Sequence, residues 1–225
     1  KKFFNEGLKF LKKKKCSGLI NGPISKKTFL NGKFNGITEF LANKTHSKNP
    51  VMLIYNKKLS VSPLTTHLPI SKVSRNIKKE KIIANIIKIN DFYRNVLKII
   101  PRIAITGLNP HCESFDNENK EKKEIVPAIR YLKKKRINIQ GPYAADTIFL
   151  RENIKKFDLI FGMYHDQVLT PIKTLYGFNA INITLGLPFI RISPDHGPNI
   201  KMLGKNKSNP ESLIEAIRFF EKYAF

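Results

Sequence analysis

The stretch INIQGPYAADTIFLRENIKKFDLIFGMYHDQVLTPIKTLYGFNAINIT, residues 137–184, decides the fold class. Short apolar runs at 137–140, 157–162 and 180–184 predict strands, and the longer segments at 146–156 and 168–175 predict helices between them. Strands and helices that alternate in this way are typical of a mostly parallel sheet with helices on both faces. The chain is therefore predicted to be an α/β protein.

The same alternation extends to both sides of this stretch. We expect a strand at 102–106 and a helix at 120–136 before it, and a short strand at 189–192 after it. Ser208 and Glu211 have the spacing of a capping box and predict a last helix that ends near Tyr223. Nearer the amino terminus the pattern predicts an amphipathic helix at 2–15, strands at 17–20, 51–55 and 58–61, and a long helix at 72–99 ended by Pro101.

The composition limits the class of protein. The formal net charge is +24, but the lysines are spread along the whole chain without an aromatic-interleaved basic motif, so we expect no specific nucleic-acid binding. No apolar run approaches the roughly 18 residues of a membrane span, and no membrane association is expected. Cys16 and Cys112 lack CxxC spacing and no export signal is recognised, which together favour a reducing, cytoplasmic location.

Three of the five histidines follow apolar runs, and we expect each of them to lie in a loop. They are His67 in Leu-Thr-Thr-His-Leu-Pro, His111 in Gly-Leu-Asn-Pro-His-Cys, and His165 in Met-Tyr-His-Asp-Gln. Three neutral imidazoles can hold one divalent metal with a position left open for substrate. The alternative is that each is only a surface or hydrogen-bonded residue, because spacing along the chain does not establish contact and no HExxH pair is present.

Several motifs occur in one order along the chain. They are Asn21-Gly-Pro-Ile-Ser-Lys26, Gly36-Ile-Thr-Glu-Phe40, Thr65-Thr-His-Leu-Pro69, Gly107-Leu-Asn-Pro-His111, Gly141-Pro-Tyr-Ala-Ala-Asp-Thr-Ile-Phe149, Met163-Tyr-His-Asp-Gln167, Asn182 through Arg191, and Asp195-His-Gly197. Together they resemble the 4-hydroxythreonine-4-phosphate dehydrogenase family of pyridoxal phosphate biosynthesis. The resemblance implies an isopropylmalate-dehydrogenase-like α/β/α sandwich. Residues 1–225 would form the carboxy-terminal two thirds or so of a two-domain dehydrogenase, with an internal boundary that the sequence leaves open.

The resemblance also implies an activity, the NAD- or NADP-linked oxidation and decarboxylation of 4-phosphooxy-L-threonine to 3-amino-2-oxopropyl phosphate. It implies that His67, His111 and His165 bind one divalent metal, which can be zinc, magnesium or cobalt. Such a metal would lower the pKa of the substrate hydroxyl, favour hydride departure to nicotinamide, and stabilise the enolate of the second step. The family further implies a homodimer whose active site takes residues from both subunits.

Four further positions match substrate-binding residues of the family: Thr38, Lys173, Asn182 and Arg191. Arg191 attracts attention even without the resemblance, because an unpaired charge in an apolar strand would be costly. Asp195 and His196 are candidates for a place near the nucleotide or the substrate, without an assigned role.

Two residues beside the predicted metal site have open alternatives. Asp146 is the candidate catalytic carboxylate that orients a ligand or handles a proton, and it is equally a candidate helix N-cap, with the two roles compatible. Cys112, next to His111, is either a thiolate ligand or a small residue that fills space.

Two departures from the family pattern affect the expected activity. Ile37 stands where the family has a substrate-contacting histidine, and the loss of one charged hydrogen bond predicts substrate binding weaker by about one to two powers of ten. The chain also lacks the family's amino-terminal portion, so a truncated non-catalytic remnant is one alternative. A related dehydrogenase acting on another phosphorylated hydroxy acid is the other.

Overall fold

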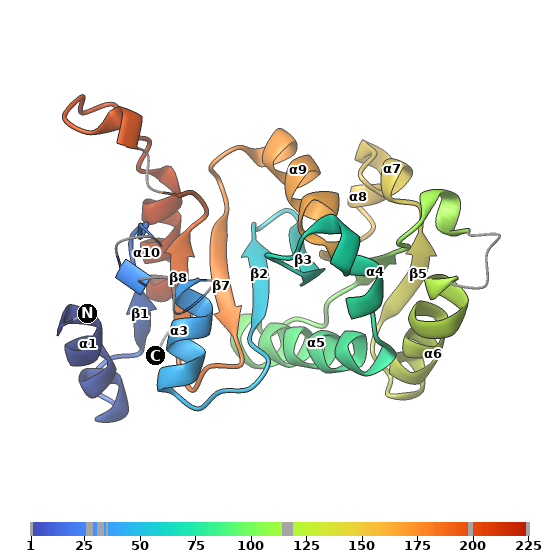
Figure 1. The fold of residues 1–225 in the computed structure, drawn as a ribbon, viewed down its shortest axis with the longest axis horizontal. Coiled ribbons are helices and arrows are strands. Elements are labelled where there is room, and N and C mark those ends of the chain that lie inside the picture. Colours follow the sequence, from blue (N-terminus) through green and yellow to red (C-terminus); the bar gives the residue numbers. More distant parts are fainter. Residues whose placement is uncertain are drawn as a thin grey trace. The chain divides into compact units, whose positions relative to one another are not determined.

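The computed structural model describes residues 2–25, 29–30, 34, 36–113, 119–197 and 200–223 (Figure 1). The chain divides into two compact units. Residues Val51–Leu175 form the central unit, and residues Lys1–Pro50 together with Tyr176–Phe225 form the terminal unit. Each unit has its own strands, helices and buried core.

The central unit is built on five strands in the order β2-β3-β6-β4-β5. Their bounds are β2 Val51–Tyr55, β3 Ser60–Thr65, β4 Ile103–Thr106, β5 Ile139–Tyr143 and β6 Leu159–Tyr164. β2 pairs with β3 in the antiparallel sense, whereas β3, β6, β4 and β5 are parallel neighbours. The carboxyl ends of four adjacent strands therefore share one edge of this sheet.

Helices cover this sheet on both faces. They are α4 Val73–Asn76, α5 Lys79–Phe92, α6 Val126–Lys134, α7 Ala145–Ile148, α8 Arg151–Ile154 and α9 His165–Tyr176, with 3-10 turns at Ile70–Lys72 and Pro110–Cys112 and π turns at Tyr93–Leu97 and Glu121–Ile125. Every residue of β3 and all but the last of β6 are buried. Because successive side chains of a strand point to opposite faces, both faces of these strands must be covered.

The terminal unit contains three strands. β8, Ile190–Pro194, lies between β1, Gly18–Ile20, which is parallel to it, and β7, Ile181–Leu185, which is antiparallel. The helix α10, Glu211–Tyr223, packs on all three strands, and a side chain at Gly18 would overlap the ring of Phe220. Helices α1, Lys2–Lys12, and α3, Ile37–Lys44, enclose an apolar cluster centred on Leu8, Leu30, Phe40 and Leu41, against which Leu19 of β1 packs. A 3-10 turn, Ile200–Met202, lies between β8 and α10 in the sequence of this unit.

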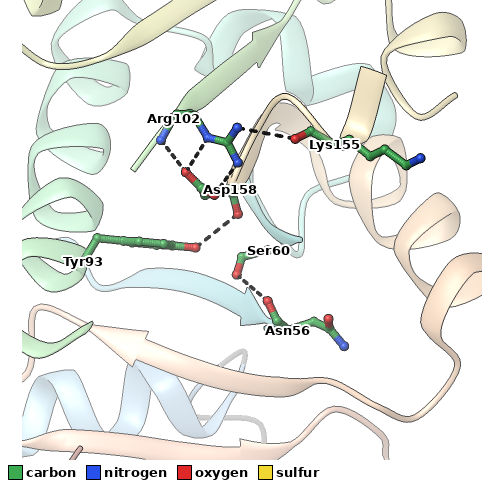
Figure 2. Close-up of polar contacts among 6 residues, drawn as sticks. All are labelled: Asn56, Ser60, Tyr93, Arg102, Lys155 and Asp158. Carbon is green, nitrogen blue, oxygen red and sulfur yellow. Dashed lines mark hydrogen bonds and ion pairs between the residues drawn. The ribbon is translucent and has the colours of Figure 1, made fainter. Parts of the chain in front are cut away.

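A cluster of polar residues lies at the amino-terminal ends of the parallel strands in the central unit and connects them by hydrogen bonds (Figure 2). Asp158, just before β6, accepts hydrogen bonds from the backbone N–H, Nε and Nη2 of Arg102 at 2.8, 3.1 and 2.9 Å. The Asp158 carbonyl accepts from the Ser60 backbone at 3.0 Å and from the buried Tyr93 hydroxyl at 3.3 Å. Burial alone would raise the pKa of Asp158, but its hydrogen bonds to Arg102 and the charge of that residue hold the pKa below its usual value. The cluster therefore joins the starts of β3, β4 and β6.

The predicted alternation of strands and helices is confirmed, with parallel pairs in the majority, but several bounds were wrong. The expected helix at 72–99 is broken at Ile77, whose extended backbone buries its side chain between α4 and α5. The expected helix at 146–156 is two short helices, α7 and α8, and the helix α3 was not predicted. The last helix begins at Glu211, whose backbone N–H donates to the Asn209 side chain at 2.8 Å, so the capping box from Ser208 is absent.

Candidate functional site

Four of the predicted site residues follow the carboxyl ends of adjacent parallel strands in the central unit. His67 comes two residues after β3, and His165 comes directly after β6. His111 follows β4, and Asp146 follows β5. In α/β proteins this edge is where ligands bind, because the connecting segments there present side chains and backbone groups on a rigid sheet.

The structure brings His67 and His165 together at a pocket of about 200 Å³. Their ring centroids lie 6.1 Å apart, so both imidazoles can face a common point between them. The pocket is lined by Thr66, His67, Leu68, Ile70, Val73, Tyr164, His165 and Asp166. Two nitrogen donors and one carboxylate beside an apolar wall form a donor set that suits a borderline divalent ion.

His165 is fixed by its place in the backbone. It is the first residue of α9 and follows Tyr164 of β6 without an intervening loop, so its assignment to a loop was wrong. Its Nδ1 lies 2.6 Å from Oδ1 of Asp166. When Nδ1 carries the proton and donates to Asp166, Nε2 presents its lone pair, which is the arrangement of a metal-binding histidine with an outer carboxylate.

His111 lies one strand further along the same edge and is exposed. It sits in the Pro110–Cys112 turn with a φ of 56°, an unusual backbone conformation for a side-chain-bearing residue. Within the described part of the chain, no three His, Cys, Asp or Glu side chains lie close enough together to hold a metal ion. The structure therefore pairs two of the three predicted ligands, and ligation by all three stays a prediction.

A buried glutamate holds the segment that leads to His111. Glu121 is 2% exposed, and its Oε1 accepts the backbone N–H groups of Leu108 and Asn109 at 2.8 Å each. Its Oε2 accepts the side-chain amide of Asn109 at 3.0 Å. No sequence pattern predicted this role, because Glu121 is one of several charged residues at the start of an expected helix.

Asp146 is exposed in the first turn of α7, and that helix contacts the turn that carries His111. The N-cap position is held by Ala144, so the N-cap alternative for Asp146 was wrong.

Cys112 lies in the same turn as His111. Burial raises the pKa of the Cys112 thiol, and the charges of Glu121, Asp146 and Glu113 add to this rise. Both roles of Cys112, thiolate ligand and space-filling residue, stay predictions, because a bound metal ion would itself lower the pKa of the thiol. Lys173, half-buried in α9, belongs to the same unit.

Arg191, in β8 of the terminal unit, is 1% exposed and hydrogen-bonded. Its Nε donates to Oδ1 of Asn21 at 2.7 Å and its Nη1 donates to the hydroxyl of Thr184 at 3.0 Å. Burial lowers the pKa of Arg191 to about 10, and the negative charge of Glu39 opposes that shift. The guanidinium therefore stays charged at neutral pH and is hydrogen-bonded to Asn21 and Thr184 in a buried polar cluster.

The other predicted substrate-binding residues of this unit lie near that cluster or in α3. Asn182 is two residues from Thr184 in β7, and its Oδ1 is buried with no hydrogen-bond partner among the described residues. Thr38 is half-buried in α3. Ile37, at the position where the resemblance predicts a histidine in the family, packs against the apolar cluster around Phe40.

Asp195 and His196 follow the end of β8. The backbone N–H of the buried Asp195 donates to the hydroxyl of Ser212 in α10 at 2.9 Å. The His196 ring meets the ring of Phe178 edge-on, with centroids 6.0 Å apart. These contacts fix both residues within the terminal unit and give neither a chemical role.

Comparison with known proteins identifies the family. The family model described as pyridoxal phosphate biosynthetic protein PdxA matches residues 1–220. The chain belongs to this family. A 4-hydroxythreonine-4-phosphate dehydrogenase of Sulfurihydrogenibium sp. is 42% identical over 219 residues, which are 96% of this chain and 67% of that relative. A second relative of the same name, from Xanthobacter autotrophicus, is 37% identical over 93% of this chain and 63% of its own length.

Solved structures agree with the assignment. The structure of a putative 4-hydroxythreonine-4-phosphate dehydrogenase from Salmonella typhimurium matches with a TM-score of 0.81 and 31% identity, covering 95% of this chain and 66% of that chain. The resemblance drawn from the motifs and the α/β sandwich class are thus confirmed. The chain spans about two thirds of the length of the relatives that it matches. No helix in the described ranges is both long and apolar enough to cross a membrane.

Proposed function

We propose that this chain takes part in the NAD(P)-linked oxidation and decarboxylation of 4-phosphooxy-L-threonine to 3-amino-2-oxopropyl phosphate, a reaction of pyridoxine biosynthesis. One observation carries the proposal. In a chain that belongs to the PdxA family, His67 and His165 line one pocket at the carboxyl edge of a parallel sheet, with ring centroids 6.1 Å apart. Relatives named 4-hydroxythreonine-4-phosphate dehydrogenase support the same activity.

The side chains at this edge suit a divalent metal such as zinc, cobalt or magnesium. His67 and His165 would hold it, with His111 as the third ligand and Asp166 orienting His165. When bound, the metal supplies Lewis acidity at the substrate hydroxyl, and nicotinamide accepts the hydride. Zinc and cobalt suit an imidazole set better than magnesium does, because magnesium prefers oxygen ligands.

The remaining predicted residues have roles in the same proposal. Asp146, exposed at the end of β5, would orient a ligand or move a proton. Thr38, Lys173, Asn182 and Arg191 are proposed as substrate-binding residues for the phosphate and the polar groups of the substrate. Asp195 and His196 are proposed near the nucleotide or the substrate. A homodimer with a shared active site and a cytoplasmic location belong to the proposal as well.

The test is a turnover assay. The protein is mixed with 4-phosphooxy-L-threonine, NAD or NADP, and zinc, cobalt or magnesium, and the absorbance of the reduced nicotinamide is followed. We expect turnover that disappears when His67, His111 and His165 are all changed to alanine. The matched control is His46→Ala, which changes a histidine that is not among the residues that line the pocket. Turnover no higher than that of the triple variant would refute the enzymatic proposal and favour a non-catalytic remnant.

Ile37 favours a second candidate, a dehydrogenase for another phosphorylated hydroxy acid. Its side chain is committed to the apolar cluster around Phe40, so the hydrogen bond of the family's histidine is absent at this position. If turnover with 4-phosphooxy-L-threonine is slow, the same assay with other phosphorylated hydroxy acids tests this candidate. A higher kcat/KM for one of them would establish it.

A further inference from the structure

Gln167 connects two of the strand ends that carry the predicted metal ligands. It is the third residue of α9 and is buried. Its Oε1 accepts the hydroxyl of Thr106, the last residue of β4, at 2.8 Å, and the backbone N–H of Met163 in β6 at 2.7 Å. Its Nε2 donates to the carbonyl of Gly107 at 2.8 Å. One carboxamide therefore joins β4, β6 and α9 where each approaches the site.

The peptide groups of Met163 extend this connection to β3. While the Met163 N–H donates to Gln167, the Met163 carbonyl accepts the hydroxyl of Thr65 at 2.8 Å. Thr65 is two residues before His67, Met163 is two residues before His165, and Gly107 is four residues before His111. Every predicted histidine ligand thus lies within four residues of a member of one buried hydrogen-bond network.

The backbone allows Gln167 to reach these partners. A Cβ at Gly162 would overlap the side chain of Val168 and lie 3.0 Å from Oε1 of Gln167. The absence of a side chain there lets α9 approach β6 closely. Both ends of the carboxamide are needed, because a carboxylate could accept from Thr106 and Met163 but could not donate to Gly107.

We propose that Gln167 is a positioning residue for the histidine pocket. By holding the ends of β3, β4 and β6 together, it sets the spacing at which His67, His111 and His165 meet a divalent metal. This inference rests on the proposed metal-binding role of these histidines. Outer hydrogen-bond partners of metal ligands typically change metal affinity by about 10- to 100-fold when they are removed.

A purely structural role would give a different result. Loss of any buried hydrogen bond lowers the thermal midpoint, whereas only loss of a positioning bond also weakens metal binding in protein that is still folded. Ser62→Ala is the matched control. The Ser62 hydroxyl is buried in β3 and donates to the Met52 carbonyl at 2.7 Å, but it has no hydrogen bond to the Gln167 network.

The experiment measures cobalt(II) affinity by titrating the ligand-field absorption of the folded chain. We expect Gln167→Met to raise the dissociation constant about 10- to 100-fold. Ser62→Ala should change it by less than about threefold, within the range that a remote structural bond produces. Thr106→Val, which removes one bond to Gln167, should raise it by a smaller factor, and Thr106→Ser, which keeps the hydroxyl, should restore it. The Thr106 pair decides the question if Gln167→Met fails to fold.

Amide hydrogen exchange of the metal-free chain distinguishes failure of the Gln167 positioning role from failure of the proposed metal binding by the histidines. We expect Gln167→Met to speed exchange at residues 66–68 and 107–112 more than Ser62→Ala does. Unchanged exchange, or equal cobalt affinity for wild type and for the Gln167 and Thr106 variants, would overturn the positioning role. If the wild-type chain binds no cobalt while exchange still responds to Gln167→Met, the metal-binding part of the proposed function fails, and the positioning of metal ligands fails with it.

Discussion

Replacing Glu121 by alanine tests whether one buried carboxylate holds the segment that carries His111. The substitution removes the acceptor of two backbone N–H groups, those of Leu108 and Asn109, which are only half-buried. An unsatisfied buried donor costs about 1–3 kcal/mol, and water can reach these two in part, so we expect a loss of about 2–4 kcal/mol in local stability. Glu121→Gln keeps an oxygen for both backbone N–H groups but loses the charge and the acceptor of the Asn109 side-chain amide, so we expect it to cost the two backbone groups about 1 kcal/mol.

Amide exchange at Leu108 and Asn109 reports this local stability directly. Since about 1.4 kcal/mol corresponds to a factor of ten, exchange should become roughly 30- to 1000-fold faster in Glu121→Ala and about fivefold faster in Glu121→Gln. Glu124→Ala is the control, because Glu124 lies in the same π turn but accepts the Lys79 backbone N–H at 2.7 Å instead. Equal exchange in Glu121→Ala and in Glu124→Ala would refute the reasoning.

Three further predictions concern stability and substrate binding. Asp158→Asn should lower the free energy of unfolding by about 1–2 kcal/mol at neutral pH, since the amide has one acceptor oxygen instead of two and no charge, and so loses at least one of the three hydrogen bonds from the half-exposed Arg102. Because the folded-state pKa of Asp158 is lowered, its contribution is present above the unfolded pKa of about 3.9 and lost as the pH falls through the folded value, so urea unfolding of wild type and variant should converge in acid. Gly18→Ala should cost about 1–3 kcal/mol in urea unfolding because its Cβ overlaps Phe220, whereas Gly22→Ala, with nothing within 4 Å, should be nearly neutral. Ile37→His should lower the KM for 4-phosphooxy-L-threonine by about 10- to 100-fold with little change in kcat, and an unchanged KM would show that this position does not contact the substrate.

The fold could be predicted wherever local periodicity and tertiary structure agree. Apolar runs marked the strands of the central unit, most clearly β6, whose residues Leu159–Tyr164 are nearly all apolar, as is typical of a parallel strand covered on both faces. The break at Ile77 could not be predicted, since a buried isoleucine suits a helix and an extended segment equally well. The helix α3 was missed because its eight residues are too few to show a clear helical period.

The histidines of the candidate site could be predicted from the sequence, but the buried residues that hold their segments in place could not. The histidine motifs pointed to one edge of the sheet, and the structure places His67, His111 and His165 after three adjacent strands there. Two of the three hydrogen-bond partners of Gln167, Gly107 and Thr106, lie 60 and 61 residues away in sequence, so no local pattern predicts the role of Gln167. The supporting role of Glu121 could not be predicted either, because the sequence of a charged segment does not show which glutamate is buried and which is exposed.

The direct passage from β6 into α9 has a consequence for how this chain can vary. Loops usually absorb insertions and deletions, but no connecting residue separates Tyr164 from His165. One residue inserted there would turn the rest of α9 by about 100° relative to the strand, given 3.6 residues per helical turn. That rotation would carry His165 out of the pocket and pull Gln167 off Thr106 at the same time. We therefore expect relatives to vary in length in other connections of the sheet and to keep this junction at constant length.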